Sequence, residues 1–313
     1  MKQLGSEAFG RARHFLKTEA RSLEWALFAH WFEEGSVDDA LAALARFQNA
    51  DGGFGHALEP DVRTPQSSAL ATGIGLGLLR DLGVPATHPM VRRAVAYLLE
   101  TFDEEKKVWR VLPEGASAYP HAPWWHDDEG SLARTFDEFV VIPRMQLVGL
   151  LHHFAAEVPA EWLETVTQRT LEEFLRLGDV GSGGGDDLVY AIEMAETEAL
   201  PARFKTPLVA RIREIVPQVV ERDPAAWDSY CISPLKLVSS PDSLVYDLLA
   251  EDVQANLDYQ IAHQTEAGTW EPTWTWGDAY PEAWAEAKRE WRGELTLSML
   301  ETLDAFDRIE TVR

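Results

Sequence analysis

Two kinds of helical segment alternate along almost the whole chain. In the first kind, apolar residues recur every three or four positions and charged residues fill the other positions, as around Leu208, Ile212 and Ile215. This spacing is typical of a helix with one buried face. In the second kind, such as residues 140–154, apolar residues occupy nearly every side, so the helix needs cover on all sides. The alternation predicts an inner layer of buried helices within an outer layer.

The two kinds form six predicted pairs, in each of which an outer helix precedes an inner one. The pairs are residues 6–17 and 21–33, 37–48 and 67–82, 88–102 and 135–155, 160–177 and 186–199, 206–222 and 234–249, and 251–264 and 294–308. The inner members begin about 54 residues apart on average, a spacing close to that of helical-pair repeats. No segment shows the clear two-residue alternation of a strand. The sequence therefore predicts an all-α fold, an (α/α)6-type toroid, with an open superhelix as the alternative.

No linker rich in Gly, Ser or Pro separates the pairs, so we expect residues 1–313 to form a single toroid domain. One predicted inner helix contains Gly73, Gly75 and Gly77, each of which costs roughly 1 kcal/mol of helix propensity relative to alanine. We expect these glycines where a crowded inner layer requires close approach of backbones.

Charge and cysteine content narrow the classes of function. The chain carries 28 Lys and Arg against 52 Asp and Glu, a formal net charge of −24, so its surface would repel nucleic acid and anionic membranes. Cys231 is the only cysteine, which excludes an intrachain disulfide and disfavours a cysteine-based zinc site. The chain lacks a signal segment and a run of about 18 apolar residues, so we expect a cytoplasmic protein without a membrane span. We predict no cofactor, no metal site and no obligate protein partner.

Two segments between an outer and an inner helix share a motif. Residues 47–55 read FQNADGGFG, with Thr72 on the next helix, and residues 264–270 read QTEAGTW. The glutamines end outer helices, where an amide can bond to orphan backbone groups of a neighbouring helix end, and the glycines permit turns with positive φ. The motifs resemble the repeat of protein prenyltransferase β-subunits and squalene-cyclase-like terpenoid cyclases, in which Q-x-x-x-G-x-W is called a QW motif. The resemblance implies an α/α toroid with a central cavity for a hydrophobic, isoprenoid-like ligand.

The catalytic motifs of that family are absent from the sequence. There is no DxDD motif of class II cyclases and no DDxxD motif for diphosphate-bound metal. Two residues separate Asp228 from Cys231, whereas the zinc-binding Asp-x-Cys motif has one. Three classes of function stay open. They are a terpenoid-cyclase-like enzyme or binding protein, a carbohydrate-active α/α-barrel hydrolase or lyase, and a non-catalytic scaffold.

Four polar loops that lead into inner helices, residues 55–61, 121–129, 181–187 and 270–278, supply the candidate site residues. The candidate acids and bases are His56, Glu59, Asp61, Asp127, Asp187 and Asp278. The candidate ligand-binding aromatics are Trp124, Trp125, Trp270, Trp274 and Trp276. Structural roles stay open beside these, since acids at a helix start serve as caps and tryptophans as core.

The two enzymatic interpretations assign these residues differently. For an isoprenoid-like ligand, Asp61 or Asp187 is the acid, and Trp274 and Trp276 stabilise positive charge through cation–π interaction. For a carbohydrate, Glu59, Asp127 or Asp278 performs acid–base chemistry beside aromatic faces that stack on a sugar ring.

Overall fold

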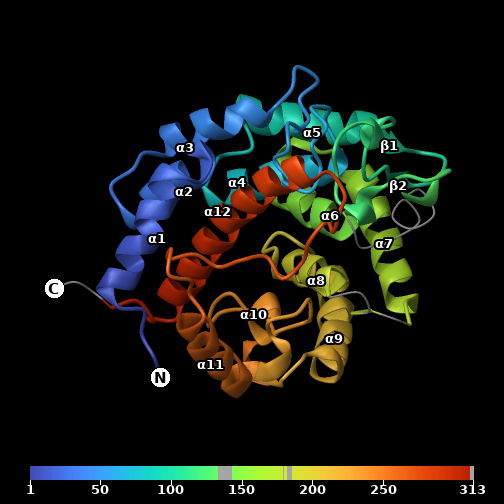
Figure 1. Ribbon diagram of the computed structural model, residues 1–313. Helices are drawn as coiled ribbons and strands as arrows, with labels where there is room; N and C mark the ends of the chain where they lie inside the picture. Colours follow the sequence, from blue (N-terminus) through green and yellow to red (C-terminus); the bar gives the residue numbers. More distant parts are fainter. Residues whose placement is uncertain (133–142, 179, 182–184, 311–313) are drawn as a thin grey trace. The chain divides into compact units, whose positions relative to one another are not determined.

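The computed structural model describes residues 1–132, 143–178, 180–181 and 185–310. Within these ranges the chain is predominantly helical, which confirms the all-α class (Figure 1). The helices are α1 (Ser6–Thr18), α2 (Ser22–Phe32), α3 (Val37–Leu44), α4 (Ala69–Asp81), α5 (Pro89–Thr101), α6 (Arg144–His153), α7 (Ala160–Arg176), α8 (Asp186–Glu196), α9 (Ala202–Val219), α10 (Pro234–Leu237), α11 (Tyr246–Ala262) and α12 (Pro281–Ala305). Two parts of the predictions, residues 135–142 of an inner helix and glycines 182–184 of a candidate loop, lie outside the described residues.

The chain divides into two compact units, each of which is described by itself. Unit 1 comprises residues 1–43 and 216–313, and unit 2 comprises residues 44–215. The single domain predicted for residues 1–313 stays a prediction.

In unit 1, α12 packs against both α1 and α2, and α10 packs against α11. The two ends of the chain are also tied together. Leu4 and Ile309 form a parallel bridge, in which the Leu4 N–H donates to the Arg308 carbonyl at 2.8 Å and the Glu310 N–H donates to the Leu4 carbonyl at 2.9 Å. Backbone bonds therefore hold the start of α1 close to the end of α12.

In unit 2, α6 has the character predicted for an inner helix. Every residue from Arg144 to His152 is buried, and α6 packs against α4, α7 and α8. The neighbouring α7 shows the single buried stripe predicted for an outer helix, with Leu163, Val166, Thr170 and Phe174 buried. The contrast between apolar and amphipathic segments therefore distinguishes helices that are covered on all sides from those covered on one.

Two predicted inner helices differ from the structure. The helix predicted over residues 234–249 is wrong, because α10 ends at Leu237 and α11 begins only at Tyr246. Between them Ser243 Oγ accepts the backbone N–H groups of Ser239 and Ser240, at 3.2 and 3.1 Å, which offers the backbone a turn in place of a helix. α12 begins at Pro281, well before the predicted residue 294, since proline is well suited to the first turn of a helix.

A small hairpin also departs from the expectation of no strands. Strand β1 (Phe102–Asp103) pairs antiparallel with β2 (Val108–Trp109) at the end of α5. The Trp109 indole is buried and donates to the Leu98 carbonyl at 2.7 Å. These residues follow an outer helix, as the two glutamine motifs do, but they lack both the glutamine and the glycine.

The glycines of α4 lie in different surroundings. A Cβ built on Gly73 would lie 2.7 Å from Gln146 Oε1, and one on Gly75 would lie 2.7 Å from the Phe54 ring. A Cβ on Gly77 would meet nothing within 4 Å. Close contacts therefore exist at two of the three positions, but the neighbours are side chains, so the predicted close approach of backbones is not found at these glycines.

Candidate functional site

The first glutamine turn, residues 48–54 of unit 2, connects several helices. The Gln48 side-chain amide donates to the carbonyls of Gly52 and Met90, at 2.9 Å each. The Phe54 N–H donates to Thr72 Oγ1 of α4 at 3.0 Å. A bond from this amide to a neighbouring helix was predicted. The predicted acceptor was an unpaired carbonyl at a helix end, but Met90 lies in the first turn of α5, where carbonyls accept bonds within the helix.

The second glutamine turn, residues 264–270 of unit 1, makes the same set of bonds. The Gln264 amide donates to the Gly268 carbonyl at 3.0 Å and to the Ala8 carbonyl at 3.2 Å. The Trp270 N–H donates to Thr296 Oγ1 of α12 at 3.3 Å. Ala8 lies in the first turn of α1, so α1 has the same relation to this turn as α5 has to the first. Both turns are joints between helices, and Trp270 is part of the joint.

Two of the four candidate loops lie side by side in unit 2. The Ala122 N–H donates to the Asp61 carbonyl at 2.9 Å, and the Arg63 N–H donates to the Pro120 carbonyl at 3.0 Å. Val62 and His121 form an antiparallel bridge between these bonds. Loops that are far apart in the sequence therefore contribute to one polar region.

Four ionisable side chains belong to this region, of which Glu59, Asp61 and His121 are buried and His126 is exposed. Glu59 is 8% exposed and Asp61 is 2% exposed. The His121 and His126 rings are stacked, and His121 Nε2 lies 2.9 Å from His126 Nδ1. Because one of these nitrogens must donate and the other accept, a single N–H···N hydrogen bond joins the two histidines. Two buried carboxyls and a histidine pair are groups suited to proton transfer.

Several predicted residues of these loops have structural partners. His56 is exposed, and its Nε2 lies 2.8 Å from Asn49 Oδ1. Asp127 Oδ1 accepts the Leu132 N–H at 3.1 Å. Trp125 is buried, whereas Trp124 is largely exposed. Glu59, Asp61 and Trp125 are therefore the buried candidates of the paired loops, whereas His56 and Trp124 are exposed.

Asp187, in the first turn of α8, is bound to its own loop. Its Oδ2 accepts the Gly181 N–H at 2.7 Å and its Oδ1 accepts the Leu188 N–H at 2.8 Å. Burial raises the pKa of the Asp187 carboxyl, against the lowering effect of these bonds. The arrangement favours a structural role for Asp187, as a first-turn acid of α8 that binds its own loop.

In unit 1, the loop of residues 270–278 forms part of an aromatic cluster. The ring of Trp274 meets the edge of Trp291 at 5.0 Å and of Tyr230 at 6.1 Å between centroids. Trp276 is buried and lies 5.5 Å from Trp284, whereas Asp278 is exposed. Trp274 is thus the partly accessible member of the predicted aromatics.

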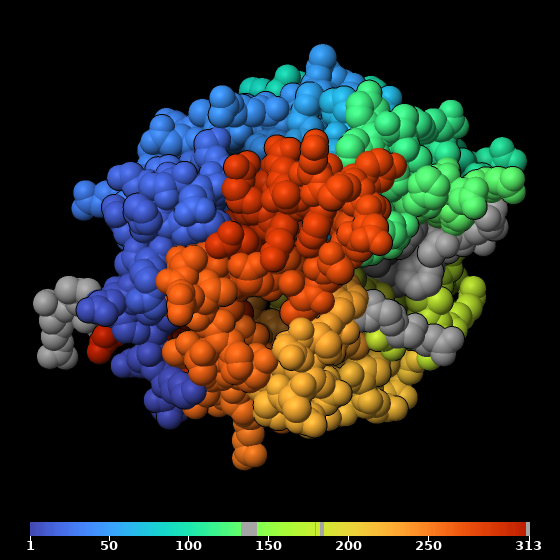
Figure 2. Space-filling model, viewed as in Figure 1, coloured from blue at the N-terminus to red at the C-terminus, as the bar shows by residue number. Residues whose placement is uncertain are grey.

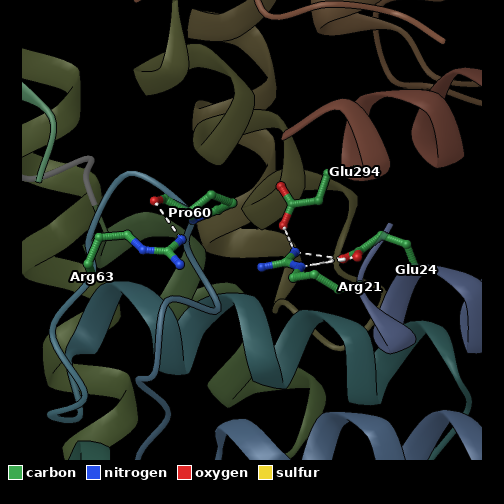
Figure 3. Close-up of polar contacts among 5 residues, drawn as sticks. All are labelled: Arg21, Glu24, Pro60, Arg63 and Glu294. Atoms are coloured by element: carbon green, nitrogen blue, oxygen red, sulfur yellow. Dashed lines mark hydrogen bonds and ion pairs between the residues drawn. The ribbon is translucent and has the colours of Figure 1, made fainter. Parts of the chain in front are cut away.

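The sequence interpretation missed an ionic cluster on α2 and α12. The Arg21 guanidinium donates to carboxylate oxygens of Glu24 and Glu294, at 2.6 Å each (Figure 3). Figure 3 also shows the Arg63 guanidinium donating to the Pro60 carbonyl, at 3.5 Å. Glu24 is buried within an otherwise apolar stretch of the predicted inner helix, and that isolated charge was the signal available in the sequence.

A second missed group lies among α4, α6 and α8 of unit 2. Burial raises the pKa of Glu193 to about 7, although Arg80 and a hydrogen bond from Gln146 lower it. Gln146 is itself buried against Gly73. A carboxyl that is protonated near neutral pH therefore lies within this layer of helices.

No protein-family model, no curated protein and no solved structure matches the chain. Among the described residues, no group of three or more His, Cys, Asp and Glu side chains is arranged to hold a metal ion. In the part of the chain that the structure describes, no helix is long and apolar enough to cross a membrane.

Proposed function

We propose that this protein is an acid–base enzyme of the α/α-toroid class that acts on a carbohydrate-like small molecule. The observation that carries the proposal is the pairing of loops 55–63 and 120–127, in which Glu59, Asp61 and His121 are buried and His121 contacts His126. A region that contains buried carboxyls is polar, so it suits a polyhydroxylated ligand better than a hydrocarbon one. A hydrolase or lyase uses such groups to move protons to and from substrate oxygen or carbon.

The toroid is part of the same proposal. Its support is that the two glutamine turns make the same hydrogen bonds. In each turn, the glutamine that ends one predicted outer helix donates to the first turn of the next predicted outer helix. In the second turn that next helix is α1, so the last repeat is joined to the first, as a closed order of pairs requires. The resemblance of these turns to terpenoid cyclases and prenyltransferase β-subunits points to the same architecture.

A second candidate function is binding or conversion of an isoprenoid-like ligand. The aromatic cluster of Trp274, Trp291 and Tyr230 favours it, because aromatic faces stabilise both hydrocarbon chains and developing cations. The buried charges of the paired loops count against it.

An activity screen separates the candidates. Oligosaccharides of neutral sugars and of uronates are offered to the full chain, and new reducing ends or unsaturated products are measured. We expect turnover that falls by roughly 10²- to 10⁴-fold in Asp61→Asn and Glu59→Gln. Glu198→Gln, an exposed acid of the same unit, serves as the control with unchanged turnover. Turnover of isoprenoid diphosphates without turnover of sugars would select the second candidate, and inactivity towards both would leave a scaffold.

A further inference from the structure

The histidine pair of the paired loops has a fixed order of donors and acceptors. His121 Nδ1 lies 2.5 Å from the Tyr119 carbonyl oxygen, and a carbonyl can only accept, so His121 Nδ1 carries the hydrogen of this bond. A neutral imidazole has one N–H, which leaves His121 Nε2 as an acceptor. This nitrogen lies 2.9 Å from His126 Nδ1, so His126 Nδ1 is the donor between the two rings.

The same rule assigns the hydrogen of the second ring. Because the neutral His126 ring carries its hydrogen on Nδ1, its Nε2 has a lone pair and no hydrogen. Among the residues that the structure describes, none bonds to His126 Nε2. His126 Nε2 is therefore the ring nitrogen of the pair that can accept a proton while the bonds from His126 to His121 and from His121 to Tyr119 stay intact.

The two rings differ in their access to solvent. His121 is 3% exposed, whereas His126 is exposed. Figure 2 shows the green segment that ends near residue 132 at the surface. A ligand can therefore reach the bare nitrogen of His126, while the buried His121 ring holds His126 in one tautomer.

The backbone on both sides of His126 is also held. The His126 N–H donates to the Pro123 carbonyl at 3.2 Å, and the His126 carbonyl accepts from Ser131 Oγ at 3.2 Å. The next residue, Asp127, donates its N–H to Ser117 Oγ at 3.0 Å. The exposed ring thus extends from a bonded turn, as a preorganised proton acceptor requires.

A neutral imidazole suits one kind of proton in particular. It is more basic than a carboxylate by about 2 pKa units, so it removes a proton from carbon more readily than Asp or Glu does. In a uronate, the hydrogen on the carbon next to the carboxyl group is acidic, and a neutral sugar has no such hydrogen. A histidine base therefore favours elimination from a uronate over hydrolysis of a neutral glycoside.

The charge of the chain narrows the uronate further. A formal net charge of −24 disfavours binding of a polyanion. Esterification removes the charge of the uronate carboxyl and makes the neighbouring C–H more acidic, because an ester withdraws electrons more strongly than a carboxylate does. An esterified uronate therefore fits both the base and the charge of the protein.

We propose that His126 is the catalytic base of a lyase reaction on esterified uronate oligosaccharides, with His121 as its positioning residue. His126 Nε2 takes the proton from the carbon next to the ester group. The electron pair of that C–H bond forms a C=C bond, and the bond from the adjacent carbon to the bridging oxygen breaks. The leaving oxygen takes a proton from water, and the imidazolium returns its proton to the hydroxide that remains. The inference rests on the proposed function for the class of ligand and assigns the base of that reaction.

The tautomers are tested without any substrate. Long-range ¹H–¹⁵N spectra of the full chain, recorded at alkaline pH where imidazole is neutral, distinguish protonated from bare ring nitrogens. We expect His121 and His126 both to carry hydrogen on Nδ1. His88 is the matched control, since its Nδ1 accepts the Met90 N–H and its hydrogen must lie on Nε2. A His126 ring with its hydrogen on Nε2 overturns the inference.

The base is tested by activity and chemical rescue. Methyl-esterified and unesterified oligogalacturonides are offered to the full chain, and unsaturated products are measured. We expect faster turnover of the ester, a loss of roughly 10²- to 10⁴-fold in His126→Ala, and partial recovery that grows with added imidazole. His14→Ala, an exposed histidine of α1, is the control with unchanged turnover. Full turnover by His126→Ala, or loss without recovery by imidazole, overturns the inference.

The positioning residue is tested with two substitutions of one side chain. His121→Gln keeps an acceptor for the His126 N–H, whereas His121→Leu does not. We expect the His126 ring to keep its hydrogen on Nδ1 and part of the turnover to remain in His121→Gln, and both to be lost in His121→Leu. Equal tautomers and equal turnover in the two variants overturn the role of His121. If His121→Leu does not fold, the wild-type tautomers and the imidazole rescue still decide.

The two proposals fail in different ways. If Asp61→Asn loses turnover of a sugar while His126→Ala keeps it, the inference is wrong and the proposed function stands. If elimination depends on His126 but not on Asp61 or Glu59, the carboxyls of the proposed function are wrong and the inference stands. Absence of turnover with every sugar, esterified or not, overturns both.

Discussion

At the scale of single residues, the two glutamine amides make one pattern of bonds in two places. Each amide nitrogen donates to a carbonyl of its own turn and to a carbonyl in the first turn of another helix, α5 for Gln48 and α1 for Gln264. We expect Gln48→Ala and Gln264→Ala each to lower the free energy of unfolding by about 1–3 kcal/mol, because both donors are lost from a partly buried joint. Urea unfolding measures the cost. Gln168→Ala, on the exposed face of α7, should change stability by less than about 0.5 kcal/mol.

That prediction also tests whether the two turns are equivalent. If Gln264→Ala lowers the free energy of unfolding and Gln48→Ala does not, the two turns make the same hydrogen bonds but do not contribute equally to stability. Comparable losses at both glutamines would support the repeat order on which the proposed toroid depends.

The glycines of the same turns are constrained in two ways. Gly52 has φ of +94°, and a Cβ there would lie 2.4 Å from the Arg93 carbonyl oxygen. Gly268 has φ of +83°, and a Cβ there would lie 2.5 Å from the Ala12 nitrogen. Because the neighbour is backbone in both cases, we expect Gly52→Ala and Gly268→Ala to shift whole helices and to cost more than 3 kcal/mol, on the order of a severe backbone substitution.

Gly115 provides the matched control for these glycines. Its φ is +80°, but a Cβ there would meet nothing within 4 Å. Gly115→Ala should therefore cost only the left-handed conformation, about 1–2 kcal/mol. Thermal unfolding followed by circular dichroism compares the three variants, and equal losses in all of them would mean that φ alone matters and the close approach does not.

At the scale of whole elements, the largely buried helix α4 shows how packing and helix propensity separate. Gly75 faces the Phe54 ring, whereas Gly77 faces open space. We expect Gly77→Ala to stabilise the protein by up to about 1 kcal/mol through helix propensity. Gly75→Ala should destabilise it by about 1–3 kcal/mol, since the Phe54 ring must move. Chemical denaturation measures both, and a stabilised Gly75→Ala would contradict the assigned packing.

The elements also show what a sequence can and cannot predict. The apolar composition of residues 144–152 identifies α6 as a buried helix without further information. The break between Leu237 and Tyr246 was missed, because it depends on hydroxyl groups that bond to local backbone where the apolar pattern continues. Competition between side-chain hydroxyls and the helical hydrogen bonds of the backbone does not change the spacing of apolar residues, so that spacing cannot reveal it.

The candidate site was less predictable than the helices. Sequence spacing selected Glu59 and Asp61, but it did not predict that residues 120–122 would bond to their loop. The Arg21–Glu294 contact joins residues at opposite ends of the chain, and no local pattern encodes such a pair. Side chains that meet through tertiary packing become visible only when the fold is known.

At the scale of the whole molecule, protonation and folding are linked through buried groups. The pKa of Glu193 and of Glu294 is raised to about 7 in the folded chain, from a usual value near 4.5. Folded protein therefore binds protons more tightly than unfolded protein between these two values. The stability that these carboxyls contribute is fully present below about pH 4.5 and is lost as the pH rises through about 7.

His152 acts in the opposite direction. Burial lowers its pKa to about 4 from 6.5, and its Nε2 lies 2.8 Å from Thr167 Oγ1. Its contribution is present above about pH 6.5 and is lost as the pH falls through about 4. Between these limits the pH dependence that the histidine gives to the free energy of unfolding partly cancels the dependence that the two carboxyls give. A pH profile of the wild type therefore does not report any one of these groups alone.

A comparison of variants isolates the carboxyls. Glutamine cannot ionise, so the stability of Glu193→Gln and of Glu294→Gln relative to wild type should rise as the pH increases from about 4.5 to about 7.5, by at most about 1.4 kcal/mol per pH unit for each residue. His152 is present in every protein of the comparison, and its effect cancels. Urea unfolding at fixed ionic strength measures the difference, with Glu198→Gln as an exposed control that should show no slope. A flat difference for Glu294→Gln would mean that Arg21 keeps this carboxyl ionised throughout.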